Sequence, residues 1–290
     1  MNTKYGLVIE GGALRGIFSA GVLDYLIEKN IKFPYICGVS MGACVGMNVV
    51  TGQQGRARKT IMHEGSESYY GKDSLLSTGS LIDLDKTFGE YPYKQYPFEF
   101  KKYFASDVEN ECVATDMATG EAVYLSEKKS EKRLLDITRA SASLPFVTKP
   151  TEVDGKMYAD GGIADPVPVK RAFLKGCKKC IVVLNRPYDS PVKSNRQMTA
   201  AASVVYKNYP EFVEAYGKRA AVKASRLQLL KLLEDAGMVY VIRPTVQEIG
   251  RFESDKSRLM NYYMNGYELA ERKYEEIIRF LGEDNVIFDV

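Results

Sequence analysis

The sequence predicts an α/β fold in which helices flank a mostly parallel central sheet. Near its start, two apolar strands, at residues 7–9 and 35–37, are each followed by a glycine-containing turn and then by a helical pattern, at residues 17–29 and 43–50. This alternation is typical of parallel strands covered by helices. The composition agrees, because 45% hydrophobic and 27% charged residues make an ordinary globular balance.

The later elements continue the alternation after one irregular segment. A helix is predicted at residues 55–64. The aromatic segment 66–104 is broken by Pro92 and Pro97, so we expect loops and short helices that form a satellite core rather than a lid or a lipid-contacting wall. The other predicted elements are strands at 111–115, 122–126, 180–185 and 238–243, a hairpin at 152–158, and helices at 131–143, 167–175, 197–206, 211–235 and 257–281.

Residues 1–290 are expected to form one domain, because no repeat, low-complexity tract or linker divides them. The motif-bearing core covers about residues 5–190, and a helical C-terminal part covers about residues 191–290. The N-terminus lacks the apolar region of a signal peptide, and no apolar run reaches the length of a membrane span. A cytoplasmic location is therefore predicted.

Charge and cysteine content argue against several kinds of function. The 40 basic and 37 acidic residues are spread along the chain with a net charge of +3, so no nucleic-acid partner is predicted. This surface is compatible with transient contact to a membrane without requiring it. The five cysteines suit reduced thiols. Cys177 and Cys180 have CxxC spacing, but without a second pair and with a single histidine they disfavour a metal or redox role.

Ser40 is the first candidate for chemistry. It is the central residue of Gly-Val-Ser-Met-Gly at residues 38–42, a G-x-S-x-G pattern that places a serine on a sharp turn between a strand and a helix. A strand-to-helix turn that merely requires small residues would give the same pattern. If Ser40 is a nucleophile, it needs a base, donors for the oxyanion and a pocket.

The sequence offers few residues that could take the proton from Ser40. The only histidine, His63, lies at the far end of the next helical region, so we expect it on the surface or in a satellite core rather than beside Ser40. The base must then be a carboxylate, a lysine or another group within hydrogen-bond reach of Ser40. A carboxylate has an ordinary pKa of about 4, which makes it a weak base unless position or burial helps. Asp160 is the leading candidate because glycines follow it, and an Asx-type turn is the alternative interpretation.

The glycine-rich turn at residues 10–16 could supply the oxyanion donors, because such a turn between a strand and a helix presents unpaired N–H groups to an anion. It could equally bind a nucleotide phosphate. However, its spacing is not G-x-G-x-x-G, and no P-loop lysine follows.

Together these segments resemble the patatin-like phospholipase family. The family's oxyanion signature is similar to Glu-Gly-Gly-Ala-Leu-Arg-Gly at 10–16, its elbow to residues 38–42, and its Asp-Gly-Gly to residues 160–162. Weaker matches lie at residues 114–120, 140–145 and 166–168. The resemblance covers about residues 5–190 and implies a patatin-like three-layer architecture.

The resemblance implies a catalytic dyad of Ser40 and Asp160 without a histidine, metal or cofactor. Gly11, Gly12 and Ala13 would provide the oxyanion hole; Ala13 stands where many members have glycine, so a positive φ there has a cost. Arg15 would brace this loop, with contact to a substrate phosphate as the weaker alternative.

The expected function is a serine acyl hydrolase of lipid esters, acting through a covalent acyl-enzyme. Two alternatives remain open at this point. One is a non-catalytic lipid- or acyl-binding protein on the same fold, and the other is a nucleotide-binding protein that uses the first glycine turn. The head group, the acyl length and the oligomeric state are not specified by any of these motifs.

Overall fold

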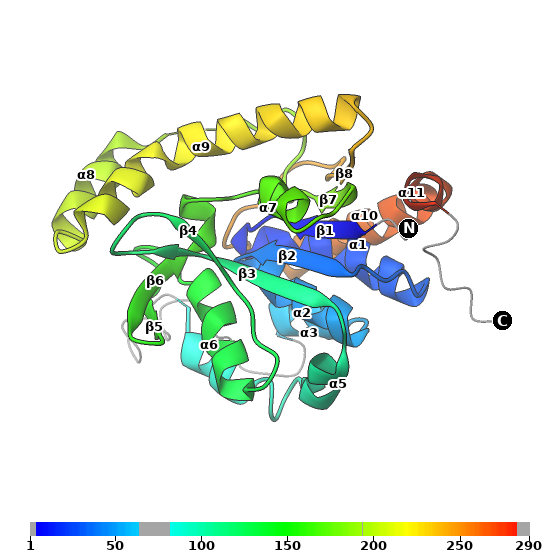
Figure 1. The fold of residues 1–290 in the computed structure, drawn as a ribbon, viewed down its shortest axis with the longest axis horizontal. Helices are drawn as coiled ribbons and strands as arrows, with labels where there is room; N and C mark the ends of the chain where they lie inside the picture. The colour runs from blue at the N-terminus through cyan, green and yellow to red at the C-terminus, as the bar shows by residue number, and fades with distance from the viewer. Residues whose placement is uncertain (1–3, 64–81, 193, 283–290) are drawn as a thin grey trace.

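The central sheet contains a parallel run of five strands. A computed structural model describes residues 4–63, 82–192 and 194–282 (Figure 1). Within it the parallel strands lie in the order β3 (Glu109–Asp116), β2 (Tyr35–Val39), β1 (Tyr5–Ile9), β7 (Lys179–Val183) and β8 (Val239–Ile242). The strands β4 (Ala122–Leu125), β5 (Thr151–Val153) and β6 (Lys156–Asp160) join antiparallel. The predicted mostly parallel sheet is confirmed.

Strands β2 and β6 lie end to end along the same side of β3. Val113 of β3 pairs with Val39 of β2 on one side and with β4 on the other. Thr115 pairs with Ala159 of β6 and, again, with β4. Because β4 occupies one side of β3 at both positions, β2 and β6 must share the opposite side. The end of β6, at Asp160, therefore lies close to the end of β2.

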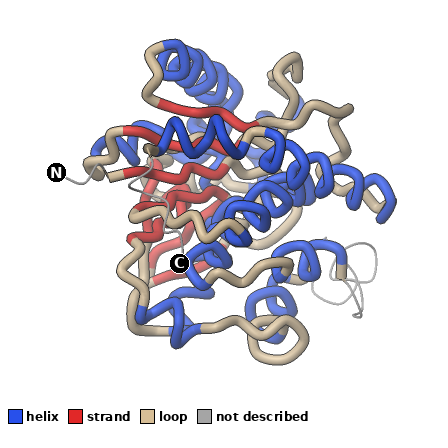
Figure 2. The backbone as a smooth tube through the Cα atoms, turned by 90° about the vertical axis from the view of Figure 1, so that its right-hand side faces the viewer, coloured by secondary structure: helices blue, strands red, loops and turns tan. Residues whose placement is uncertain are grey.

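Alternating side chains of the strands enter two separate cores, one on each face of the sheet. In β1, Leu7 and Ile9 belong to one core and Val8 to the other, which is the period of two expected for a strand buried on both faces. The three layers are visible in Figures 1 and 2. The first core packs against α1 (Ile17–Glu28), α2 (Met41–Thr51), α3 (Arg56–Met62), α6 (Glu131–Ser141), α10 (Lys256–Arg272) and α11 (Tyr274–Leu281), and the second against α7 (Val169–Leu174) and α9 (Pro210–Asp235).

A third apolar cluster joins the C-terminal part of the chain to the end of β6. Helix α8 (Arg196–Val205) contributes Ala202, the start of α9 contributes Phe212 and Tyr216, and the β6 region contributes Ala159 and Ile163. Figure 1 shows α8 at one end of the molecule and α9 running from it along the sheet. A single domain remains a prediction that these contacts favour.

The described part of the aromatic segment, residues 82–104, divides between a small separate cluster and the main core. Tyr91 and Tyr96 meet edge to face with ring centroids 5.1 Å apart, and the rings of Phe98, Phe100 and Tyr103 belong to the main core. The regular structure of this segment is short: helical residues 84–85 lead into a π-helical turn, η2 (Lys86–Glu90), and α5 (Phe100–Ala105) follows. The satellite-core prediction therefore holds for Tyr91 and Tyr96 only. Residues 66–81 lie outside the described residues.

Two predicted helices differ from the structure, one by a break within it and one at its end. The helix predicted at 257–281 is divided into α10 and α11 at Lys273, whose φ of −97° and ψ of 6° are not helical. No glycine or proline marks this bend in the sequence. The helix predicted at 55–64 ends at Met62, and His63 follows it with a left-handed φ of 52°.

Helices α1 and α10 approach each other closely because each has a glycine at the contact. A Cβ atom on Gly21 would lie 2.1 Å from the carbonyl oxygen of Tyr263, and one on Gly266 would lie 2.2 Å from that of Phe18. Neither distance is tolerated by a real Cβ atom, so the pair of glycines sets how closely the two helices pack.

We expect Gly266→Ala to lower the free energy of unfolding by about 1–3 kcal/mol, because the added methyl group forces α10 away from α1. Urea denaturation of the purified protein measures this change. Gly89→Ala is the matched control, since a Cβ atom there meets no atom within 4 Å. Equal midpoints for wild type and Gly266→Ala would contradict the close-packing argument.

Candidate active site

Ser40 occupies a strained turn between β2 and α2. Its φ of 54° and ψ of −124° are sparsely populated for a residue with a side chain, a conformation that costs roughly 1–3 kcal/mol and clusters at functional sites. The flanking glycines are sterically required. A Cβ atom on Gly38 would lie 2.5 Å from the carbonyl oxygen of Gly42, and one on Gly42 would lie 2.5 Å from that of Ile9. The elbow geometry predicted from the sequence is present.

Ser141 holds this turn from the side of α6. The Ser40 N–H donates to the Ser141 hydroxyl oxygen at 2.8 Å, and that hydroxyl donates to the carbonyl oxygen of Val113 at 2.5 Å. The buried Ser40 N–H is thereby satisfied in a turn where no backbone acceptor is in register. Ser141 lies in the weak motif at 140–145, but the sequence assigned it no role.

Asp160 is buried beside Ser40, with only 5% of its surface exposed. Its carboxylate accepts a hydrogen bond from the Gly162 N–H at 2.8 Å and interacts with the nearby Ser40 hydroxyl, which lowers its pKa. Burial, the largest effect, raises the pKa of Asp160, and these two contacts and the charge of Arg251 oppose that shift. The Gly162 contact also makes the Asx-type turn, so both interpretations of Asp160 describe the same geometry.

The first glycine turn lies directly against Ser40. A Cβ atom on Gly11 would lie 2.9 Å from the Ser40 Cβ atom. Ala13 adopts a left-handed φ of 51° in spite of its methyl group. Within the described part of the chain, the N–H groups of Gly11, Gly12 and Ala13 donate to no protein acceptor, and all three residues line a cavity that contains Ser40. They are therefore available to an anion there.

Arg15 points from this turn toward the C-terminal part of the chain. Its guanidinium donates to the carbonyl oxygen of Ile249 at 2.9 Å and pairs with Glu248 at 2.7 Å. Glu248 also pairs with Arg186 at 2.8 Å. Arg15 thus connects the glycine turn to the segment after β8, and its charge is already compensated.

His63 does not line either cavity that contains Ser40. It is buried after α3 with its ring 6.4 Å from that of Tyr91. Burial lowers the pKa of His63 to about 4, with smaller contributions from Lys256 and Lys86. The satellite-core prediction for His63 is confirmed, and the imidazole is neutral near pH 7.

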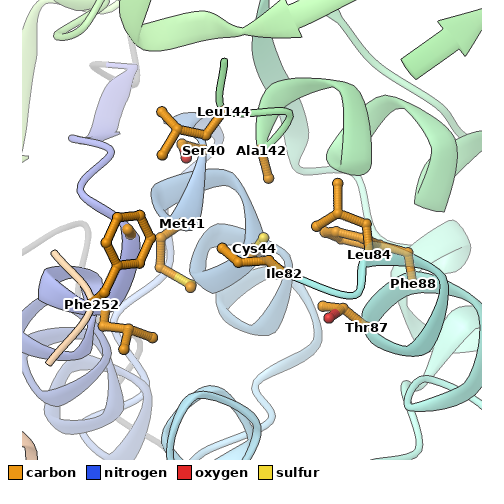
Figure 3. Close-up of a pocket in the computed structure, with 12 residues that line it drawn as sticks. Ser40, Met41, Cys44, Ile82, Leu84, Thr87, Phe88, Ala142, Leu144 and Phe252 are labelled. Carbon is orange, nitrogen blue, oxygen red and sulfur yellow. The ribbon is translucent and has the colours of Figure 1, made fainter. Parts of the chain in front are cut away.

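An apolar pocket opens on one side of Ser40 (Figure 3). Met41 and Cys44 of α2 form part of its wall, and Leu84 and Phe88 from the aromatic segment face them. Burial raises the pKa of Cys44 to about 12, so this thiol is neutral and does not compete with Ser40 as a nucleophile. The aromatic segment therefore lines the pocket as well as contributing to the small separate cluster and the main core.

A polar cleft opens on the other side of Ser40 and contains Asp160 and the glycine turn. Three cations from the C-terminal part line it, and sequence motifs had not singled out any of them: Arg219, Lys223 and Arg251. Lys223 pairs with Glu10 at 2.6 Å, directly before the glycine turn. Ser40 therefore lies at the junction of an apolar pocket and a polar cleft.

Metal ligation, thiol state and membrane spans can be checked in the residues that the structure describes. No group of three or more histidine, cysteine or acidic residues is placed to hold a metal ion there. All five cysteines are free thiols. None of the helices in the described ranges is both long and apolar enough to cross a membrane.

Comparison with known proteins identifies the family. Residues 7–173, more than half of the chain, match the model of the patatin-like phospholipases. The chain belongs to the patatin-like phospholipase family. The elbow, the acidic residue and the glycine turn of this patatin-like chain all lie within the matched range. Residues 209–282, which supply Arg219, Lys223 and Arg251, match a separate model, a domain of unknown function called DUF6363.

Curated relatives agree with this family. The patatin-like chain is 30% identical over 198 residues to the uncharacterized protein YjjU of Escherichia coli. The aligned residues make up 63% of this chain and 52% of YjjU. The chain is 28% identical over 174 residues to the uncharacterized NTE family protein Rv1063c of Mycobacterium tuberculosis, covering 57% of this chain and 44% of that protein. The chain thus spans about half the length of these relatives.

Two further proteins are similar over most of the patatin-like chain. The lysophospholipase nte1 of Aspergillus niger is 30% identical over 296 residues, covering 94% of this chain and 18% of that protein. The crystal structure of VipD from Legionella pneumophila superimposes with a TM-score of 0.52 and 13% identity, covering all of this chain and 72% of VipD. The likeness to VipD shows the fold alone.

We expect Asp160→Asn to be more stable than wild type at neutral pH. Because the folded-state pKa of Asp160 lies above its unfolded value, the wild type loses stability as pH rises through that folded pKa, whereas the amide does not ionise. The difference between the two melting temperatures should therefore be small near pH 4 and grow toward pH 8.

Asp154→Asn is the control of opposite sign. Asp154 is exposed, and its hydrogen bond with Arg133 lowers its pKa, so the wild-type carboxylate stabilises the fold above its unfolded pKa and loses this effect in acid. Melting curves that shift in parallel for both variants at every pH would contradict the assignment of a raised pKa to Asp160.

Proposed function

We propose that the protein is a serine acyl hydrolase that cleaves fatty acyl esters of lipids with Ser40 as nucleophile and Asp160 as general base. The observation that carries this proposal is the strained Ser40 elbow beside a buried carboxylate, at the junction of an apolar pocket and a polar cleft. Family membership and the similarity to a lysophospholipase support a lipid ester as the substrate class.

The Ser40–Asp160 contact supports a two-residue mechanism. The Asp160 carboxylate takes the hydroxyl proton while the Ser40 oxygen forms a bond to the ester carbonyl carbon, whose π electrons move to the oxygen. Collapse of this intermediate releases the alcohol, which takes the proton from Asp160, and leaves an acyl-enzyme. Water, activated by Asp160, then releases the fatty acid and restores Ser40.

The raised pKa of Asp160 suits it to this role. A carboxylate buried beside Ser40 is a stronger base than an exposed one, because the desolvated anion gains more from accepting a proton. No other acidic residue among those lining the cleft is free for the task, since Glu10 is paired with Lys223.

In this mechanism the glycine turn stabilises the oxyanion. The N–H groups of Gly11, Gly12 and Ala13 lie beside Ser40 without protein acceptors in the described residues, and each well-oriented donor contributes roughly 3–4 kcal/mol to the transition state. Arg15 acts as the brace of this turn through Glu248 and Ile249. Its paired charge argues against the alternative role of binding a substrate phosphate.

The apolar pocket is the proposed site of the acyl chain. Its walls at Met41, Leu84 and Phe88 carry no charge, and Ser40 lies at its rim (Figure 3). Burial of the chain there would place the ester carbonyl next to the glycine turn. A cytoplasmic location and transient contact with a membrane surface remain predictions of the sequence.

We expect a fluorophosphonate probe to label wild type and His63→Ala but not Ser40→Ala. Asp160→Asn should label slowly and should hydrolyse a p-nitrophenyl ester about 10²–10⁴-fold less efficiently, the usual contribution of a general base. Gel fluorescence and initial rates measure the two effects. Loss of labelling in a folded His63→Ala variant would refute the dyad, and lipid binding without any labelling would favour a non-catalytic lipid-binding protein.

The pH dependence of kcat/KM provides a separate prediction. Because Asp160 must be ionised to accept the proton, activity on a neutral ester should fall in acid, with a midpoint above the ordinary aspartate pKa of about 3.9. The change of kcat/KM with pH should not depend on the ionisation of His63, whose pKa is already lowered to about 4. Unchanged pH profiles for His63→Ala and wild type are the expected result; a limb near pH 6.5 that disappears in His63→Ala would contradict it.

A further inference from the structure

Two arginines from the C-terminal part line the cleft at Ser40 without a carboxylate partner among the described residues. Arg219 lies on α9 and stacks over the Tyr216 ring with its guanidinium carbon 3.7 Å from the ring centroid, while it donates to the Tyr216 carbonyl oxygen. Arg251 lies in the turn after β8. Its backbone is anchored at the glycine turn, because its carbonyl oxygen accepts the Leu14 N–H at 3.1 Å.

The neighbouring cations differ, because each has an acidic partner. Lys223 pairs with Glu10 at 2.6 Å, Arg226 with Asp165 at 2.8 Å and Arg15 with Glu248 at 2.7 Å. Arg219 is half-buried and Arg251 is exposed. A guanidinium without an acidic partner keeps its full capacity to bind an anion in a bidentate manner. Of the cations that line the cleft, Arg219 and Arg251 are therefore the two without an acidic partner among the described residues.

Arg219 and Arg251 also lie close enough to affect each other. The charge of Arg251 contributes to a lowered pKa of Arg219, after the larger effect of burial, and it opposes the raised pKa of Asp160. Two like charges held in one cleft repel each other, and a bound anion between them would relieve that repulsion. Arg251 therefore lies within electrostatic reach of both the second arginine and the proposed catalytic carboxylate.

The cleft offers no carboxylate that is free to pair with a cation. Of its two lining carboxylates, Glu10 pairs with Lys223, and Asp160 accepts the Gly162 N–H and is the proposed catalytic base. A head group that carries an ammonium ion would bring a positive charge toward two unneutralised arginines. A head group with phosphate as its only charge would bring no positive charge toward these arginines and would pair with them.

We propose that Arg219 and Arg251 bind the phosphate of an anionic lipid head group, so that the enzyme prefers net-anionic glycerophospholipids or lysophospholipids to zwitterionic ones. This inference rests on the proposed function, because it places the phosphate in the polar cleft when the acyl chain occupies the apolar pocket. It also assigns a role to residues 209–282, the segment that matches a domain of unknown function: they supply the head-group site for the patatin-like core.

The test compares lysophosphatidylglycerol with lysophosphatidylcholine of the same acyl chain, each in micelles of a neutral detergent. We expect wild type to favour the anionic lipid at least tenfold in kcat/KM, and Arg219→Gln and Arg251→Gln each to reduce that ratio by about tenfold, the usual effect of losing a charged hydrogen bond. Using the ratio cancels any common change in catalytic rate. Arg251→Lys, which keeps the charge, should retain more of the ratio than Arg251→Gln.

Lys218→Gln is the matched control. It removes the same charge from the neighbouring position of α9, but Lys218 is exposed, pairs with Glu214 and does not line the cleft. The ratio of kcat/KM for lysophosphatidylglycerol to that for lysophosphatidylcholine should be the same in Lys218→Gln as in wild type. Melting temperatures of all variants, and hydrolysis of a neutral p-nitrophenyl ester by wild type, accompany the measurement.

The outcomes separate this inference from the proposed function. Hydrolysis of the neutral ester with no preference between the two lipids would overturn the head-group site alone. An equal loss of preference in Lys218→Gln would also overturn it, because attraction to the micelle surface would then explain the effect. Failure of wild type to hydrolyse any ester would overturn the proposed function and this inference with it.

Discussion

The candidate site depends on the point at which β2 stops pairing with β3. There β6 takes over the same side of β3 from the opposite direction, so the ends of the two strands meet. Ser40 follows one end and Asp160 forms the other, which brings together a hydroxyl and a carboxylate that are far apart in the sequence. The hydroxyl of Thr115 in β3 reinforces the junction by donating to the Asp160 carbonyl oxygen at 2.8 Å. The geometry is thus fixed by backbone pairing rather than by flexible side chains.

Close backbone approach around this junction explains why small residues surround it. Gly11 lies against Ser40, Gly42 lies against the end of β1, and a Cβ atom on Gly161 would lie 2.1 Å from the Val113 carbonyl oxygen. The same approach that excludes side chains leaves unpaired N–H groups and a strained serine facing one cavity. Burial of the Asp160 carboxylate has a cost in stability at neutral pH, and it also raises the basicity of that carboxylate.

The C-terminal part completes the cavity that the patatin-like core begins. Lys223 reaches Glu10, Arg15 reaches Glu248, and the Leu14 N–H reaches the Arg251 carbonyl oxygen, so the glycine turn is tied to this part of the chain at three places. These contacts join the range matched by the family model to the range matched by DUF6363. Oxyanion stabilisation and head-group recognition would consequently depend on both parts.

The sequence by itself determined the fold class, the Ser40 elbow and the candidacy of Asp160, because glycine spacing and strand–helix alternation are local properties. It also placed His63 away from Ser40, because His63 lies at the far end of the helical region that follows the Ser40 turn. Only the tertiary structure identified Ser141 as the support of the turn, and Arg219 and Arg251 as cations in the cleft that have no acidic partner among the described residues. An arginine on a helix resembles any solvated charge until its neighbours are known, because pairing and burial arise from contacts between distant segments.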